Sequence, residues 1–225
     1  MTTAFLFDLD GTLMDSVYQH VLAWREALEK VGLELSVWRI HRRIGMSGGL
    51  FLDALLRETG RRFGPDEAAE VKRTHAAAFK RFVSTVKPLP GARDLLTYLT
   101  KAKVPWAIAT SGWLESARPM LEMLDVPSSV PIVTRDQVEH AKPDPDLFLA
   151  AAARLGAPID SCIVVGDSVW DLLAARRARA RCRIVVGWLR TGRAGARGRV
   201  PGVRGPRGLV APRLRGRRAA AKLKV

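Results

Sequence analysis

The stretch Phe5-Leu6-Phe7-Asp8-Leu9-Asp10-Gly11-Thr12-Leu13 decides how the chain folds. Its apolar residues lead directly into two aspartates and a glycine, a pattern typical of a buried parallel strand that ends in a turn. Side chains two positions apart in a strand share a face, so Asp8 and Asp10 are expected to emerge together where the sheet stops. Such a carboxylate pair needs a cation, a proton or exposure to water. The stretch predicts either a ligand site at this sheet edge or a solvated turn.

The length and composition are those of a globular protein. A chain of 225 residues can bury one sizeable core, with a small second domain. No apolar run approaches the roughly 20 residues of a membrane span, and no charged leader precedes the first strand. Cys162 and Cys182 form neither a disulfide framework nor a zinc pattern. We therefore expect a cytoplasmic protein with reduced thiols and no membrane partner.

The net charge of +15 is distributed unevenly along the chain. Residues 1–171 contain 20 Lys and Arg and all 22 Asp and Glu, whereas residues 172–225 contain the other 17 basic residues. Three interpretations of a basic tail over 191–225 remain open: binding to nucleic acid, natural disorder, and a frameshift in GC-rich codons. We favour the frameshift, because Arg, Gly, Ala and Pro dominate this segment.

The hydrophobic pattern changes along the chain. Four helices are predicted between the first strand and residue 87, over 16–31, 36–44, 50–59 and 65–86. Helices then alternate with apolar strands, which are predicted over 104–110, 130–133, 162–165 and 183–188. This alternation is typical of an α/β fold with a doubly wound, Rossmann-like parallel sheet. We expect residues 1–15 and 88–190 to form this core and residues 16–87 to form an inserted α-helical domain.

Polar residues follow four of the predicted strands: Asp8 and Asp10, then Thr110 and Ser111, then Lys142, then Asp167 and Asp171. Each has a simpler explanation when taken alone, since hydroxyls and carboxylates cap helices and most lysines are solvated. Their order is more informative. The carboxyl ends of parallel strands meet at one edge, so the four groups are expected to converge.

The four motifs together resemble those of the haloacid dehalogenase (HAD) superfamily of aspartate-nucleophile phosphotransferases. The first is Asp8-Leu9-Asp10-Gly11-Thr12, the second Thr110-Ser111-Gly112, the third Lys142, and the fourth Gly166-Asp167-Ser168 with Asp171. The helical insertion is similar to the cap of the phosphoglycolate phosphatase and β-phosphoglucomutase branch. The resemblance covers about residues 1–178, and Arg179 occupies a position where it leads us to expect glycine.

The resemblance implies a role for each carboxylate. Asp8 would be the nucleophile that forms an aspartyl-phosphate, and Asp10 would be the general acid and base. Mg²⁺ would be held by the carboxylates of Asp8 and Asp167 and by the main-chain carbonyl of Asp10. Asp171 would hold Lys142 or a metal-bound water.

It also implies how the phosphoryl group is bound. Thr110, Ser111 and Gly112 would bind phosphoryl oxygens, and Lys142 would offset the charge that grows on them. In the cap, the segment 42–49 could reach a second anionic group of the substrate through Arg43 and Ser47. The alternative is that Ser47 caps a helix and Arg43 is solvated. The histidines at 20, 41, 75 and 140 show no metal spacing and are expected to be surface or helix residues.

We therefore expect a Mg²⁺-dependent phosphatase that hydrolyses a small phosphomonoester, of the phosphoglycolate or sugar phosphate type. Asp10 favours phosphoryl transfer over dehalogenation, because a halide leaving group needs no proton. One alternative is a β-phosphoglucomutase-like phosphomutase, and another is a protein with an idle core that binds nucleic acid through its tail. The expected partner is a small phosphorylated metabolite, and the expected oligomeric state is a monomer or homodimer.

Overall fold

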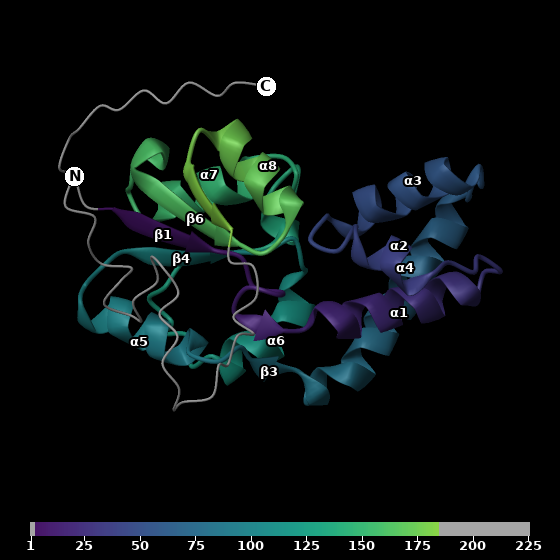
Figure 1. The fold of residues 1–225 in the computed structure, drawn as a ribbon, viewed down its shortest axis with the longest axis horizontal. Helices are drawn as coiled ribbons and strands as arrows, with labels where there is room; N and C mark the ends of the chain where they lie inside the picture. The colour runs from purple at the N-terminus through teal and green to yellow at the C-terminus, as the bar shows by residue number, and fades with distance from the viewer. Residues whose placement is uncertain (1–2, 185–225) are drawn as a thin grey trace, which may run out of the picture. The chain divides into compact units, whose positions relative to one another are not determined.

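The computed structural model describes residues 3–184, whose centre is a parallel β-sheet (Figure 1). Its strands are β1 (Ala4–Phe7), β4 (Trp106–Ala109), β5 (Ile132–Val133), β6 (Cys162–Gly166) and β7 (Arg181–Ile184). They are arranged in the order β5-β4-β1-β6-β7, and every neighbouring pair is parallel. The first strand therefore lies in the middle of the described sheet. This topology confirms the predicted doubly wound α/β core.

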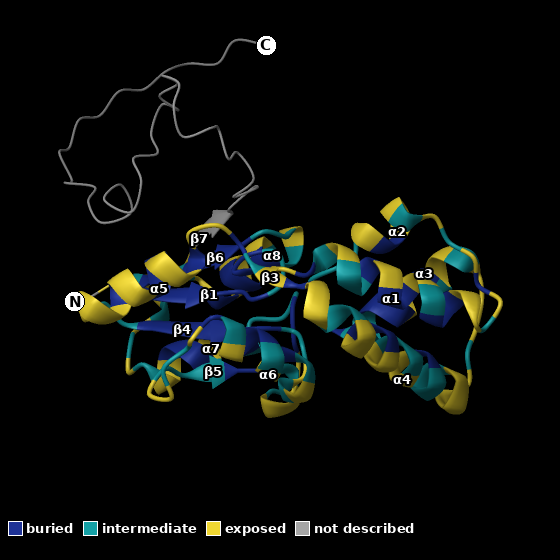
Figure 2. Cartoon of the chain, turned by 90° about the horizontal axis from the view of Figure 1, so that it is seen from below, coloured by how far each residue is buried: buried dark blue, intermediate teal, exposed yellow. Residues whose placement is uncertain are grey.

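Helices cover both faces of the sheet. They are α5 (Ala92–Lys101), α6 (Leu114–Met123), α7 (Asp146–Arg154) and α8 (Val169–Ala178), with short 3-10 helices η2 (Arg135–Gln137) and η3 (Ile159–Ser161). Alternate side chains of β1 supply the two faces, with Phe5 and Phe7 packing with α5 and α6 and Leu6 with α7 and α8. Figure 2 shows the buried strands in dark blue between helices whose outer sides are exposed.

Four further helices lie between the first strand and the rest of the core. They are α1 (Val17–Glu29), α2 (Val37–His41), α3 (Gly48–Thr59) and α4 (Pro65–Phe82), and the 3-10 helix η1 (Val83–Thr85) follows them. The short strands β2 (Met14–Asp15) and β3 (Lys87–Pro88) pair antiparallel where the chain leaves and re-enters the core. The helices share an apolar core around Trp24, Phe51 and Leu55. We keep residues 16–87 as the proposed cap.

Some predicted boundaries differ from the structure. The helix predicted over 36–44 ends at His41, because residues 42–45 form turns. The strand predicted over 183–188 begins earlier, at Arg181, and residues 185–188 lie outside the described part of the chain. Helix α6 runs through Pro119 from Leu114. Arg179 ends α8 with a φ of 63°, a left-handed conformation that glycine adopts more easily.

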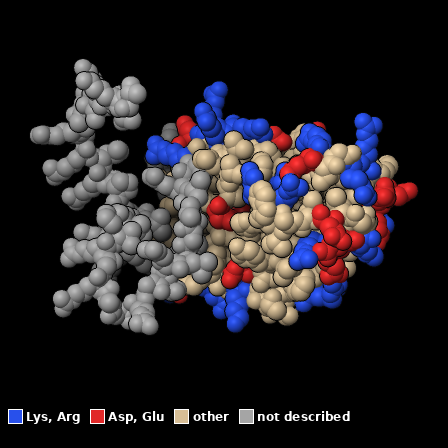
Figure 3. Space-filling view, turned by 45° about the vertical axis from the view of Figure 1, so that its right-hand side comes forward, with Lys and Arg blue, Asp and Glu red and all other residues tan. Residues whose placement is uncertain are grey.

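Charge on the described residues is mixed. On the face drawn in Figure 3, basic and acidic side chains are interspersed. This agrees with the near balance of charges over residues 1–171. The predicted tail, 191–225, lies outside the described residues. Among residues 3–184, none of the helices combines the length and the apolar character needed to span a membrane.

Candidate active site

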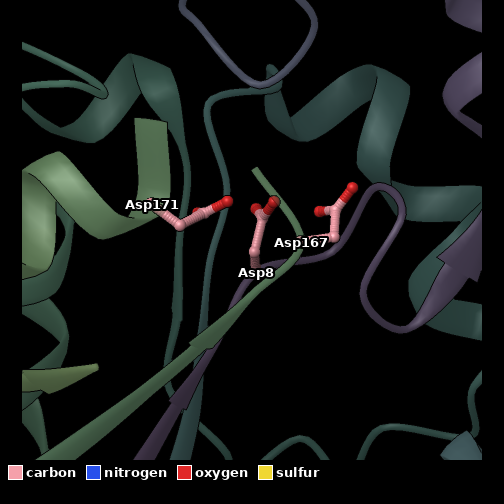
Figure 4. A group of neighbouring side chains, drawn as sticks. All are labelled: Asp8, Asp167 and Asp171. Atoms are coloured by element: carbon pink, nitrogen blue, oxygen red, sulfur yellow. The ribbon is translucent and has the colours of Figure 1, made fainter. Parts of the chain in front are cut away.

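Three carboxylates converge at the carboxyl edge of the sheet (Figure 4). Asp8 follows β1, Asp167 follows β6, and Asp171 lies in the first turn of α8. One oxygen of each lies within 4.8 Å of the others. The parallel pairing of β1 with β6 produces this convergence. The hydrogen bonding between the two strands extends to Asp8, whose amide donates to the Val165 carbonyl at 2.9 Å. The sheet thus brings together residues that are about 160 positions apart in the sequence.

Glycine permits the close approach of the chain to these carboxylates. Gly11 has a φ of 78°, and a Cβ there would overlap the side-chain oxygen Oδ2 of Asp167. A Cβ at Gly166 would likewise overlap the side chain of Asp171. The turn that ends β1 therefore depends on glycine both for its backbone conformation and for space.

Lys142 is buried among the carboxylates. Its Nζ forms ion pairs with Asp8 and with Asp171, at 2.7 Å from Oδ1 of the latter. The other oxygen of Asp171 accepts hydrogen bonds from the amide and the hydroxyl of Ser168, at 3.1 and 2.5 Å. Burial lowers the pKa of Lys142, but Asp171 and Asp8 outweigh it and raise this pKa above its ordinary value. Lys142 is therefore charged, and both oxygens of Asp171 are engaged.

The negative charges of Asp167 and Asp8 are only partly offset by Lys142. Burial, with the neighbouring Asp171, raises the pKa of Asp167 to about 6. Burial and the same neighbour also hold the pKa of Asp8 well above its ordinary value, although Lys142 opposes the shift. Thr12 donates a hydrogen bond to Asp167 at 3.0 Å. Oxygen ligands that gain from a nearby positive charge fit a hard divalent cation such as Mg²⁺.

Asp10 has a separate environment. Its Oδ1 accepts a hydrogen bond from the Ser16 hydroxyl at 2.5 Å and lies 3.2 Å from Nε2 of His20. Burial raises the pKa of Asp10, but His20 and the hydrogen bonds from His20 and Ser16 outweigh it, so the net pKa is lowered. Nδ1 of His20 in turn lies 3.2 Å from Nε2 of His75.

The contacts of these histidines were missed in the sequence. His20 and His75 do lie on helices, α1 and α4, but they face the site and each other. They are 55 positions apart, so no local spacing could have paired them. The nearest available signal was His20 itself, a titratable residue on the helix that directly follows the first motif.

The loop after β4 provides small polar groups. Thr110 is buried, and its hydroxyl accepts a hydrogen bond from the Gly112 amide at 3.0 Å. The Ser111 hydroxyl is buried and has no hydrogen-bond partner within the described residues. All three line the same cavity as Asp8 and Asp10. The loop could therefore bind phosphoryl oxygens, the role expected of it.

A cavity of about 430 Å³ connects these groups with the cap helices. From the cap it is lined by Trp24, Ser47, Asp53, Lys72 and His75, among others. Ser47 lies in it as expected, and its amide donates to the Lys142 carbonyl at 3.4 Å. Arg43 does not line it, because its guanidinium pairs with Glu58 and donates to the Arg39 carbonyl at 3.0 Å. The structure thus brings Ser47 to the site and leaves Arg43 away from it.

One edge of the parallel sheet thus carries two aspartates, a loop with hydroxyl groups, a buried lysine and a second pair of carboxylates. This combination is that of a phosphotransfer enzyme. The model of a protein family, described as a haloacid dehalogenase-like hydrolase, matches residues 2–179. The chain belongs to this family, which confirms the resemblance that the four motifs indicated.

Three known proteins are similar to the chain. Hexitol phosphatase A of Escherichia coli K12 is 35% identical over 184 residues, which cover 80% of this chain and 81% of the relative. The crystal structure of a hydrolase from Pseudomonas syringae has a TM-score of 0.78 and 52% identity, covering 80% of this chain and 83% of that one. A β-phosphoglucomutase from Clostridium difficile matches in fold, with a TM-score of 0.72, 23% identity, and coverage of 81% and 83%. Together with the family match, the named relative identifies the chain as a phosphoric monoester hydrolase.

Proposed function

We propose that the protein is a Mg²⁺-dependent phosphatase that acts on a small sugar or polyol phosphate through an aspartyl-phosphate on Asp8. The observation that carries this proposal is the convergence of Asp8, Asp167 and Asp171 around one point, with Lys142 beside them. The choice of substrate class is supported by the similarity to hexitol phosphatase A.

Asp8 and Asp167, with the main-chain carbonyl of Asp10, would hold the cation. Bound there, Mg²⁺ supplies positive charge that offsets the repulsion between the substrate phosphate and the Asp8 carboxylate. Asp171 is not assigned as a ligand, because one of its oxygens faces Lys142 and the other faces Ser168. It instead positions Lys142.

The groups that attack phosphorus and transfer protons are residues of this chain. An oxygen of Asp8 forms a bond to phosphorus, and the bond from phosphorus to the ester oxygen breaks, its electrons remaining on that oxygen. Asp10 donates a proton to the departing oxygen and later takes one from the water that hydrolyses the aspartyl-phosphate. The negative charge of a bound phosphate raises the pKa of Asp10 above its value in the free protein, which helps Asp10 to carry this proton.

The phosphoryl oxygens would be bound by groups beside Asp8. The Thr110 hydroxyl and the Ser111 hydroxyl and amide would donate to them, and Lys142 would stabilise their growing charge. The unpartnered Ser111 hydroxyl supports this assignment. The leaving group would then occupy the rest of the cavity, between the loop after β4 and helices α3 and α4.

The test is phosphate release from a panel of sugar, polyol and short-chain acid phosphates, measured with Mg²⁺ or EDTA. We expect turnover of at least one sugar or polyol phosphate, loss of it in EDTA, and background rates for Asp8→Asn. The exposed Asp160 lies away from the cavity, so Asp160→Asn serves as a matched control. A wild-type protein that is inactive on the whole panel with Mg²⁺ would overturn the proposal. Turnover by Asp8→Asn would overturn the assignment of Asp8 as the nucleophile.

A second arm separates hydrolysis from phosphate transfer back to a sugar. The enzyme is incubated with a sugar monophosphate and a bisphosphorylated sugar, and both inorganic phosphate and isomerised sugar are measured. Phosphate as the main product supports a phosphatase, whereas isomerised sugar phosphate without phosphate release would show a phosphomutase. The nucleic-acid alternative concerns the tail, which lies outside the described residues.

A further inference from the structure

A chain of contacts links Asp10 to two histidines of the cap helices. Oδ1 of Asp10 lies 3.2 Å from Nε2 of His20, and Nδ1 of His20 lies 3.2 Å from Nε2 of His75. The Ser16 hydroxyl donates to the same oxygen of Asp10. Both contacts therefore involve Oδ1, while Oδ2 points toward the phosphate-binding loop, where a Cβ on Gly112 would lie 3.9 Å from it. Oδ1 is the anchored oxygen, and Oδ2 is the one available to exchange a proton with substrate.

The anchor requires a particular tautomer of His20. A carboxylate only accepts hydrogen bonds, so Nε2 of His20 must carry the hydrogen that faces Asp10. In the neutral imidazole, Nδ1 is then an acceptor, and the group beside it must be a donor. Nε2 of His75 occupies that place, and with a hydrogen on it the two rings form a continuous chain of donors and acceptors.

The surroundings of His75 fix its ring plane and keep the ring neutral. Its ring stacks on Trp24 at a centroid distance of 4.0 Å, and the His20 ring stacks on Phe79 at 3.8 Å. Packing against these aromatic rings fixes the plane of each imidazole. Burial holds the pKa of His75 well below its ordinary value, which keeps the ring neutral.

From this geometry we propose that His75 is a positioning residue, which fixes the tautomer of His20 and thereby leaves Oδ2 of Asp10 as the proton-donating oxygen. The inference rests on the proposed function only in assigning acid catalysis to Asp10. His75 itself need not touch the reacting atoms. It acts through His20, from a helix that the sequence places more than 60 residues from Asp10.

The variants separate the hydrogen bond from the packing. His75→Phe keeps an aromatic ring against Trp24 but has no donor. His75→Gln places an amide nitrogen near the position of Nε2, so it retains a donor, whereas His75→Asn is too short to reach His20. Circular dichroism and thermal melting establish that each variant folds. If the Phe variant does not fold, the comparison of Gln with Asn carries the test.

The first readout does not require activity. Nitrogen-15 NMR of labelled histidines distinguishes a hydrogen on Nε2 from one on Nδ1. We expect His20 to be in the Nε2–H form in the wild type and in His75→Gln, and to shift toward Nδ1–H in His75→Phe and His75→Asn. An unchanged His20 tautomer in both variants that lack the donor would overturn the proposal, whether or not the wild type hydrolyses any ester.

The second readout is kcat/KM on two kinds of ester. An alkyl phosphate needs a proton on its leaving oxygen, whereas p-nitrophenyl phosphate releases a stable anion and does not. We expect His75→Phe to lower kcat/KM for the alkyl ester about tenfold, less than the roughly 10²–10⁴-fold that acid catalysis usually supplies, because Asp10 itself remains. The value for the aryl ester should change less than about threefold. An equal loss on both esters would show a purely structural role. If the wild-type protein hydrolyses neither ester, that result counts against the proposed function. The NMR measurement of the His20 tautomer then decides the role of His75.

Discussion

Lys142 Nζ lies 2.7 Å from Oδ1 of Asp171, and both side chains are completely buried. Lys142 lies in the loop that leads to α7, and Asp171 lies in the first turn of α8, where it also accepts hydrogen bonds from Ser168. The ion pair therefore connects this loop to the start of α8. A buried cation that loses one of its two partners retains most of its desolvation cost. The pair is therefore both a stability element and the support that places Lys142 beside Asp8.

We expect Asp171→Asn to destabilise the protein by about 3–5 kcal/mol, the usual effect of breaking a buried ion pair. Urea denaturation followed by circular dichroism measures this free energy of unfolding. Asp160→Asn changes the same chemical group at an exposed position and should stay within about 0.5 kcal/mol of the wild type. Equal stability of the two variants would contradict a structural role for the pair.

Gly11 and Gly32 provide a matched test of the turn that ends β1. Both have a left-handed backbone, with φ of 78° and 71°, but a Cβ at Gly11 would overlap Asp167, whereas one at Gly32 would meet nothing within 4 Å. Alanine at either site carries a conformational cost of about 1–2 kcal/mol. Only Gly11→Ala should also displace Asp167 and raise the Mg²⁺ concentration needed for half-maximal activity. A similar Mg²⁺ requirement in both variants would argue against Asp167 as a ligand.

The raised pKa of Asp167 predicts how stability depends on pH without metal. Its folded-state pKa of about 6 lies above its ordinary 3.8, so the folded protein binds this proton more tightly than the unfolded chain. The resulting stabilisation is complete below about pH 4 and is lost as pH rises through about 6. In EDTA we therefore expect this contribution to the melting temperature to decrease between these pH values, and Mg²⁺ to stabilise more at pH 7.5 than at pH 5.

Asp167→Asn isolates that contribution from the rest of the protein. Asp8 has a raised pKa and changes stability in the same direction as Asp167, whereas Asp10 and Asp136 have lowered pKa values and act in the opposite direction. The measured quantity is therefore the difference in melting temperature between Mg²⁺ and EDTA, at each pH, for wild type and variant. If Asp167→Asn retains the full difference between Mg²⁺ and EDTA at pH 7.5, Asp167 does not bind the ion.

The sequence was sufficient for the sheet because its information is local. Phe5 to Asp10 shows an apolar strand and its polar end without reference to the rest of the chain. The rule that ligands bind at the carboxyl ends of parallel strands then places Asp8 near Asp167, and the structure brings them together. Lys142 could be located in the same way, and the resemblance also indicated its contact with Asp171, which the structure shows as an ion pair.

The contacts of the cap could not be predicted in this way. The pairing of Arg43 with Glu58 depends on the angle at which α3 follows α2, and no periodic pattern encodes that angle. The meeting of His20 with His75 depends similarly on the packing of α1 against α4. Side chains on two separate helices meet according to tertiary packing, which hydrophobic spacing alone does not determine.

The cap residues Arg43 and Lys72 give the last prediction, since only one of them lines the cavity. Lys72 lies on α4, and a charged hydrogen bond from it to a substrate oxygen would strengthen binding. On the best substrate of the panel, Lys72→Ala should raise KM about tenfold, which corresponds to about 1.4 kcal/mol. Arg43→Ala removes a comparable charge outside the cavity and should leave KM within about twofold, with a loss of stability below about 1 kcal/mol from its pair with Glu58. If Arg43→Ala raised KM more than Lys72→Ala, the segment 42–49 would have to move into the cavity when substrate binds, and the position of Arg43 in this structure would be that of the free enzyme only.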